Sequence, residues 1–267
     1  MNKLFLNKYL RFVSVVLLYS FFQGCTPDEE DDIYIQPIQT ATIQLEFAHQ
    51  VDGQDLILNT SNKPFTNAMG QHYNVSKLRY LISNITLHQI NGAQTKLEGY
   101  FFVDLSKPET FNYSPIIQIP FGSYSGVSYT FGFDELSNES GKYATLNAAN
   151  WNWPEMLGGG YHFMQLEGEF IDSSNNDAPF ATHMGTARKI DSTGTTYEAN
   201  HFTSFVPNSN FELNKAMTLV LTMNINEWYT HPINWDFNQY GAGIMPIYDA
   251  QKLLNKNGKD VFTATIH

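Results

Sequence analysis

Residues Leu78–His88 read LRYLISNITLH and are followed by the pair Asn91-Gly92. This stretch contains two isoleucines, a tyrosine and a threonine, and β-branched and aromatic residues favour extended strands. Asn-Gly is a strong short-range signal for a tight hairpin turn. The sequence therefore predicts a long strand here that ends in a hairpin.

Further strands are expected on both sides of this one. Ile43–His49 alternates apolar and polar residues before a turn at Asp52-Gly53, as a half-buried strand does. Aromatic residues make up 15% of the chain, and turn-forming residues punctuate it throughout. The other expected strands are Tyr100–Leu105, Gly126–Phe133, Tyr161–Phe170, Ala181–Ile190, Asn200–Val206, Ala216–Ile225 and Val261–His267.

A helix is expected only at Pro246–Asn255, with smaller helical turns near residues 147–153. Short strands separated by turns at this density are typical of a sandwich or barrel. We predict a mainly β fold, a single antiparallel β-sandwich or open barrel of about nine strands with one short C-terminal helix. This β domain is expected to span residues 41–267.

The N-terminus has the pattern of a bacterial lipoprotein. A basic start is followed by the apolar run Phe12–Phe22, and Cys25, the only cysteine, comes directly after Gly24. The apolar run is about half of the roughly 20 residues that a spanning helix needs. Residues 1–24 are therefore predicted to be a signal peptide, and Cys25 is predicted to carry the lipid.

Residues 25–40 are expected to form a tether, because the acidic run Asp28–Asp32 repels itself and stays solvated. The run resembles the export signals of surface lipoproteins in Bacteroidetes, and an ordinary soluble linker is the alternative. We expect an outer-membrane lipoprotein, held to the membrane by lipid and facing the periplasm or the cell exterior.

Charge and cysteine content exclude some functions. Removing residues 1–24 leaves 12 basic against 26 acidic residues, a formal charge of −14. Such a surface repels phosphate backbones, so no nucleic-acid partner is expected. If Cys25 is acylated, a soft-metal site must use histidine and methionine.

Histidines and methionines are placed where they could bind a metal. His162 and Met164 lie two apart on an expected strand and should project from one face, and His183-Met184 follows on an expected neighbouring strand. His49 ends the first strand. Imidazole nitrogen with thioether sulfur suits copper, Cu(I) in particular, although a lone strand histidine is more often a structural residue.

The usual enzyme signatures are missing from the sequence. It contains no Gly-rich phosphate loop, no G-x-S-x-G elbow and no H-E-x-x-H motif. The glycines Gly158–Gly160 are expected to form a bend that leads into a strand. We therefore expect a binding protein, not an enzyme.

Four segments together resemble the MbnP-like copper-binding proteins, a family that includes many lipoproteins from Bacteroidetes. They are Phe47–Gly53, Lys77–Asn84, Gly160–Gly168 and Thr182–Gly185. The resemblance implies a β-rich domain that binds one copper ion through histidine imidazoles, with His49, His162 and His183 as the expected ligands and Met164 and Met184 as supporting residues.

The resemblance also implies a modified tryptophan. In characterised relatives a tryptophan is oxidised to kynurenine and joins the site, in some cases through a partner di-haem, peroxidase-like enzyme. In one such relative the modified tryptophan lies two positions before a ligand histidine, and here that position is Phe47, which cannot yield kynurenine. Trp151 and Trp153 are the expected substitutes, with packing in a turn as their alternative role.

Two other patterns could bind ligands. The loop Asp172–Asp177 has closely spaced oxygen ligands and could hold calcium, although polar hairpin loops have this composition routinely. Trp228 and Trp235 lie in aromatic clusters that could stack on sugar rings. The main hypothesis is therefore a lipid-anchored copper-binding protein for acquisition, storage or transfer, and the alternative is a surface glycan-binding lipoprotein.

Overall fold

The computed structural model describes residues 37–267. The expected signal peptide, Cys25 and most of the expected tether lie outside these residues. Residues 38–267 pack as one compact unit. Within the described part of the chain, no helix is both long and apolar enough to cross a membrane.

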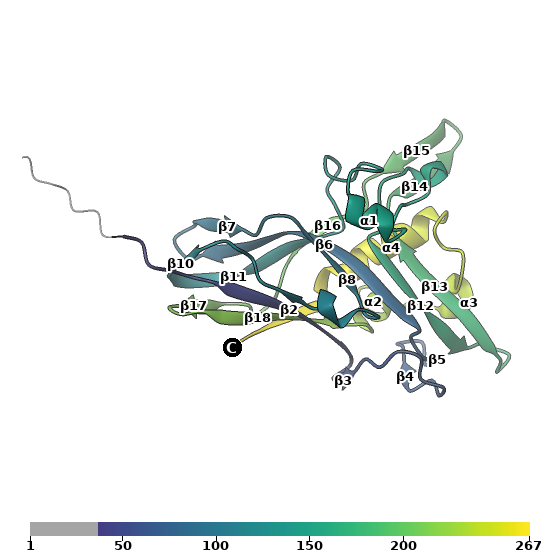
Figure 1. The fold of residues 1–267 in the computed structure, drawn as a ribbon. Helices are drawn as coiled ribbons and strands as arrows, with labels where there is room; N and C mark the ends of the chain where they lie inside the picture. The colour runs from purple at the N-terminus through teal and green to yellow at the C-terminus, as the bar shows by residue number, and fades with distance from the viewer. Residues whose placement is uncertain (1–36) are drawn as a thin grey trace, which may run out of the picture. The chain divides into compact units, whose positions relative to one another are not determined.

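Residues 78–88 lie in β6 (Lys77–Gln89), the longest strand within residues 37–267. Its first half pairs with β12 (Met164–Ile171) and β8 (Tyr100–Asp104), and its second half pairs with β11 (Gly122–Phe131) and β7 (Gln94–Lys96), all antiparallel. Asn84 lies in the middle of β6 at a positive φ of 53°, where the register with β11 shifts. β6 therefore joins two halves of a curled sheet (Figure 1).

This larger sheet has ten strands. Six of them follow one another in the order β16-β11-β6-β12-β5-β4, and the other four, β7, β8, β13 and β17, each pair with one of these six. β13 (Asp177–Met184) pairs with β12, and β17 (Phe211–Leu213) pairs with β11. The remaining members are β16 (Phe202–Phe205), β5 (His72–Tyr73) and β4 (Phe65–Thr66).

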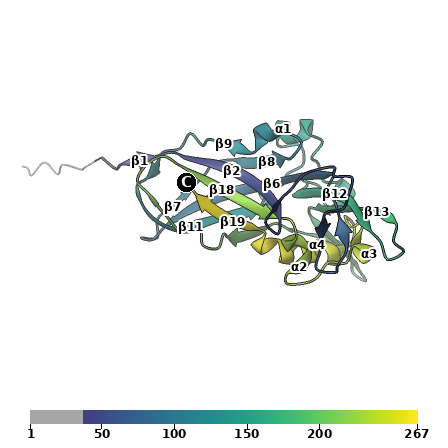
Figure 2. The ribbon, with the colours of Figure 1, turned by 90° about the horizontal axis from the view of Figure 1, so that it is seen from below.

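A second sheet of five strands has the order β19-β18-β2-β3, with β9 paired to β2 (Figure 2). β18 (Met217–Asn224) runs antiparallel to β19 (Phe262–Ile266) and parallel to β2 (Ile43–Val51). The strands β3 (Gln54–Asp55) and β9 (Asn112–Tyr113) are short. β2, near the start of the domain, therefore pairs along most of its length with a strand from near the C-terminus.

The apolar faces of the two sheets share the main core. Phe47 of β2 meets Tyr80 of β6 edge to face at 6.2 Å, and Phe262 of β19 packs at 6.0 Å from the same tyrosine ring. A smaller apolar cluster, which includes Leu81, Trp151 and Tyr161, is separate from this core. β6 thus contributes residues to both clusters, because successive side chains of a strand point to opposite faces.

The remaining elements are short. β1 (Thr40–Ala41) pairs with β10 (Ile119–Pro120), and β14 (Ala187–Asp191) forms a hairpin with β15 (Gly194–Glu198) that projects at the top of Figure 1. The helices are α1 (Ala144–Ala148), α2 (Glu227–Thr230), α3 (Phe237–Tyr240) and α4 (Tyr248–Asn257), with 3-10 turns η1 (Pro108–Thr110), η2 (Glu155–Leu157) and η3 (Gly258–Asp260).

The predicted mainly β fold of sandwich or open-barrel type is confirmed, and α4 agrees with the predicted C-terminal helix. Two details differ. The β2–β18 pair is parallel, and the expected strand Ala181–Ile190 is broken after Met184 into β13 and β14. The break falls at Gly185, whose backbone lies so close to the Trp153 indole that a Cβ there would be 2.4 Å from the ring.

Candidate metal site

His162 and His183 meet at one end of the β12–β13 hairpin. His183 lies on β13 opposite Gln165 of β12, and His162 lies two residues before β12 begins. Their ring centroids are 5.4 Å apart and the ring planes are nearly perpendicular, at 78°. The His162 residue is buried, with 6% of its surface exposed, and the His183 side chain is 16% exposed. The structure therefore brings two of the three expected ligands together.

The expected pairing of His162 with Met164 on one face is wrong. The regular strand begins only at Met164, and Phe163 and Met164 both face the main core, so the alternation is broken just before the strand. Met164 lies opposite Met184, and both thioethers are fully buried in that core. Neither methionine is therefore placed to support the histidine pair.

His49 lies on the other side of the larger sheet. Its Nε2 is 2.9 Å from the hydroxyl of Tyr80, and its ring packs against Phe111 at 5.5 Å. Tyr80 points into the main core, whereas the neighbouring Arg79 points to the face that carries His183. Burial lowers the pKa of His49 to about 4. In this structure His49 is a half-buried histidine at the edge of the main core, with a hydrogen-bond partner in that core, and it is separate from the pair.

Two tryptophans surround His162. The ring centroids of Trp151 and Trp153 lie 5.3 Å and 4.9 Å from the His162 ring, and both indoles are buried. The carbonyl of Trp151 accepts the backbone N–H of His162 at 2.9 Å and lies 3.2 Å from its Nδ1. Gly158, at a φ of 111°, helps the chain turn back so that these segments lie side by side.

Charged residues of the sheet complete the surroundings. Glu167 of β12 lies 2.9 Å from Nε2 of His183 and 2.9 Å from Nζ of Lys77, its neighbour on β6. The guanidinium of Arg79 lies 4.9 Å from the Trp151 ring centroid and donates to the side-chain oxygen of Gln165. A polar patch thus covers the face of the sheet opposite the main core.

The electrostatics of this patch keep both imidazoles neutral at pH 7. Burial, followed by the nearby His183, lowers the pKa of His162 to about 4. Burial also lowers the pKa of His183, against the opposing effect of Glu167. The pKa of Glu167 is lowered in turn, because hydrogen bonds from Lys77 and His183 together outweigh its burial. Neutral imidazole is the form that binds a metal ion.

The pair offers two nitrogens to a ligand. The hydrogen bonds described use Nδ1 of His162 and Nε2 of His183, so Nε2 of His162 and Nδ1 of His183 are the remaining donors. Within residues 37–267, no three His, Cys, Asp or Glu side chains are arranged to hold a metal. Two imidazoles without thiolates suit copper, zinc, iron or nickel, and the donor set alone does not select among them.

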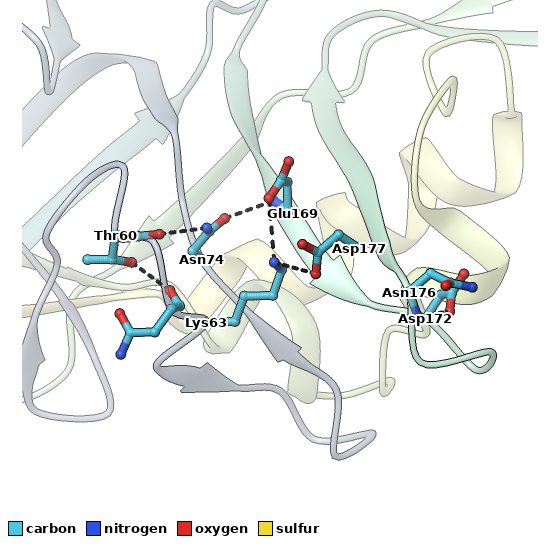
Figure 3. Close-up of polar contacts among 8 residues, drawn as sticks. Thr60, Lys63, Asn74, Glu169, Asp172, Asn176 and Asp177 are labelled. Atoms are coloured by element: carbon cyan, nitrogen blue, oxygen red, sulfur yellow. Dashed lines mark hydrogen bonds and ion pairs between the residues drawn. The ribbon is translucent and has the colours of Figure 1, made fainter.

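The carboxylates of the expected calcium loop already have partners. Asp172 Oδ1 accepts the backbone N–H groups of Ser174 and Asn176 at 2.9 Å and 2.8 Å, which caps the β12–β13 hairpin turn. Asp177 pairs with Lys63 at 2.7 Å (Figure 3). The loop is held by these contacts, and its geometry gives no support for a calcium site.

The alternative of a glycan-binding surface at Trp228 and Trp235 is also unsupported. Trp228 and Trp235 are fully buried, so neither indole can stack on an external sugar. Trp228 packs on Phe131 of β11 at 4.9 Å, and Trp235 packs on Tyr240 of α3 at 4.7 Å. Both residues belong to the main core.

Sequence reasoning missed the roles of Lys77, Arg79 and Glu167. The signal that could have identified them is a charged residue inside an otherwise apolar strand, because such a residue is rarely buried without a partner. Glu167 in β12 and Arg79 in β6 both fit this description. That Glu167 lies opposite Lys77, and Arg79 opposite Gln165, could not be read from spacing, because the register of β6 against β12 depends on the whole sheet.

A β-rich domain in which a buried and a partly buried imidazole, both neutral, meet beside tryptophan rings defines a candidate metal-binding protein. A family model described as MbnP matches residues 40–246, and the chain belongs to the MbnP family. Among solved structures, the chain is similar to MbnP from Methylosinus trichosporium, with a TM-score of 0.51 and 14% sequence identity over 86% of this chain and 99% of that one. At this identity the similarity shows a shared fold. No curated protein matches the sequence.

Proposed function

We propose that this protein binds one copper ion at the His162–His183 pair and serves in acquisition, storage or transfer of the metal, without turnover. The observation that carries the proposal is the contact between the buried imidazole of His162 and the partly buried imidazole of His183, whose pKa values are both lowered, chiefly by desolvation. Family membership favours copper over the other metals that imidazole can bind. Two protein nitrogens leave further coordination positions for a donor or acceptor molecule, which suits transfer.

The test is copper binding by the purified full-length chain. We expect about one copper per protein by elemental analysis, and we expect the double variant His162→Ala, His183→Ala to lose it. The matched control is His72→Ala, His231→Ala, because both residues are exposed on the surface. Undiminished copper content in the first double variant would refute the site.

His49 provides a second comparison. Because its half-buried ring packs against Tyr80 of the main core, His49→Ala should lower the free energy of unfolding and leave the copper content unchanged. Loss of copper from a folded His49→Ala variant would instead show that the site includes His49. This experiment separates the arrangement seen in the structure from the three-histidine site expected from the sequence.

The proposal also includes attachment to a membrane through lipid on Cys25, with the domain outside the cytoplasm. Its support is the basic start, the apolar run and the cysteine of the N-terminal sequence. Intact-mass measurement of protein purified from membranes should show a chain that begins at Cys25 with added acyl groups. A Cys25→Ala variant recovered in the same membrane fraction would contradict the anchor.

Trp151 and Trp153 are the residues that an oxidising di-haem partner would modify, if this chain follows its characterised relatives. Both rings contact His162, so a kynurenine formed at either position would lie at the proposed site. Peptide mapping of protein from its native source should place the kynurenine mass change on one of the two. Two unmodified tryptophans in copper-loaded native protein would show that the site works without this modification.

A further inference from the structure

Lys77 and Glu167 form hydrogen-bond contacts next to His183. Both carboxylate oxygens of Glu167 lie 2.9 Å from Nζ of Lys77, and one of them also lies 2.9 Å from Nε2 of His183. The Glu167 side chain is 27% exposed and that of His183 is 16% exposed. The three groups form a chain of charge-assisted hydrogen bonds that runs across three neighbouring strands, β6, β12 and β13.

The register of the sheet explains why Glu167 reaches His183. Glu167 lies opposite Lys77 on one side and opposite Ala181 on the other. Because Ala181 has only a methyl group, the glutamate can extend past it to His183, which lies two residues further along β13. Diagonal neighbours of this kind are within reach of long side chains.

We infer that Glu167, held in place by Lys77, is a positioning residue that fixes the His183 ring with its proton on Nε2 and its lone pair on Nδ1. A carboxylate can only accept, so the bond to Nε2 requires the proton there. A neutral imidazole carries one N–H, which leaves Nδ1 as the donor atom for a metal. This inference rests on the proposed function for the identity of the metal. Which nitrogen of His183 carries the proton is a property of the metal-free protein.

The competing explanation is that the Lys77–Glu167 pair only joins two strands. The chain contains a matched control for that role, because Glu169 lies two residues further along β12 on the same face. Lys63 Nζ lies 3.4 Å from Glu169 and 2.7 Å from Asp177, and this pair contacts no histidine (Figure 3). Lys63 lies in the segment before β4, so Glu169→Ala removes an ion-paired glutamate of β12 without touching the histidine pair.

The direct test is nuclear magnetic resonance of the full-length, metal-free protein with labelled histidine at pH 7.5, with the His183 signals assigned from a His183→Gln variant. We expect a solvent-protected Nε2–H signal from His183 that disappears in Glu167→Ala and persists in Glu169→Ala. Glu167→Gln keeps an acceptor oxygen without the charge, so it should retain the signal with its proton shifted upfield. A wild-type His183 without a protected Nε2–H, or the same signal in wild type and Glu167→Ala, would overturn the inference.

Copper affinity gives an independent measurement. Loss of a carboxylate that orients a metal-ligating histidine typically weakens metal binding about 10- to 100-fold, so Glu167→Ala should show a loss of that size and Glu169→Ala should stay within about twofold of wild type. Equal affinities in wild type and Glu167→Ala would refute the positioning role. If the wild type binds no copper, the proposed function fails, and the Nε2–H signal still decides how His183 is held.

Discussion

Acidification should destabilise this protein well above the pH at which its carboxylates titrate. The pKa values of His49 and His162 are lowered from 6.5 to about 4, because burial penalises the charged imidazolium. The unfolded chain therefore binds these protons first as the pH falls. The contribution of each histidine is fully present above pH 6.5 and is lost progressively as the pH falls towards 4.

The size of the effect follows from these pKa values. Proton linkage gives a loss of about 2 kcal/mol per histidine between pH 7 and pH 5, or about 4 kcal/mol for the two together. A domain of ordinary stability unfolds with about 5 to 15 kcal/mol, so this loss is a large fraction of the total. The two histidines lie in different parts of the structure and share no contact partner, so their effects should add.

The assay is urea unfolding of the metal-free protein at pH 7, 6 and 5, followed by tryptophan fluorescence. All four tryptophans are buried, so their emission reports the folded state. His49→Gln and His162→Gln should each reduce the stability difference between pH 7 and pH 5 by about 2 kcal/mol. His72→Gln, at an exposed position, is the control. An unchanged pH dependence in both core variants would refute the reasoning.

Three further predictions concern stability. Gly185→Ala places a Cβ 2.4 Å from the Trp153 indole, so a thermal melt should show about 1 to 3 kcal/mol of destabilisation. An unchanged melting temperature would contradict this close packing. Buried Gln251 donates a hydrogen bond to the carbonyl of His183 and accepts one from the N–H of Gly185. Gln251→Ala should therefore lower the free energy of unfolding by about 2 to 4 kcal/mol in chemical denaturation. A loss below about 1 kcal/mol would contradict the importance of these two bonds. Glu169→Gln should cost less than about 1 kcal/mol, because the Glu169 side chain is 56% exposed although its partner Lys63 is only 7% exposed. A larger loss would show that this ion pair does more than join surface groups.

Much of the fold could be predicted because its signals are local. The strand at 78–88 and the helix near 246–255 rest on residue type, alternation and turn pairs within about a dozen positions. The parallel pairing of β2 with β18 has no such local signal, because it joins residues 43–50 to residues 217–224. The break at Gly185 likewise depends on the distant Trp153, whose position the sequence does not state.

The candidate site was predictable in part for the same reason. His162 and His183 could be selected from their strands and their separation along the chain. The side of the sheet on which each residue lies could not be predicted. Regular alternation would put His162 and Met164 on one face, but the chain bends at Phe163, so that Phe163 and Met164 both face the main core. The expected position of His49 beside the other two histidines differs from the structure for a related reason. His49 contacts the opposite face of β6 through Tyr80, and a face is defined only once strands are paired.

The parallel pairing of β2 with β18 also governs the order in which the chain can fold. β2 is synthesised early, but its main partner, β18, lies near the other end of the chain. The other partners of β2, β3 and β9, pair with only two of its residues each. Contacts between such distant segments close slowly, because a long loop must be ordered before they form. Most of β2 therefore stays without a sheet partner until residues 217–224 are available, and a chain that ended before them would leave the five-stranded sheet unformed.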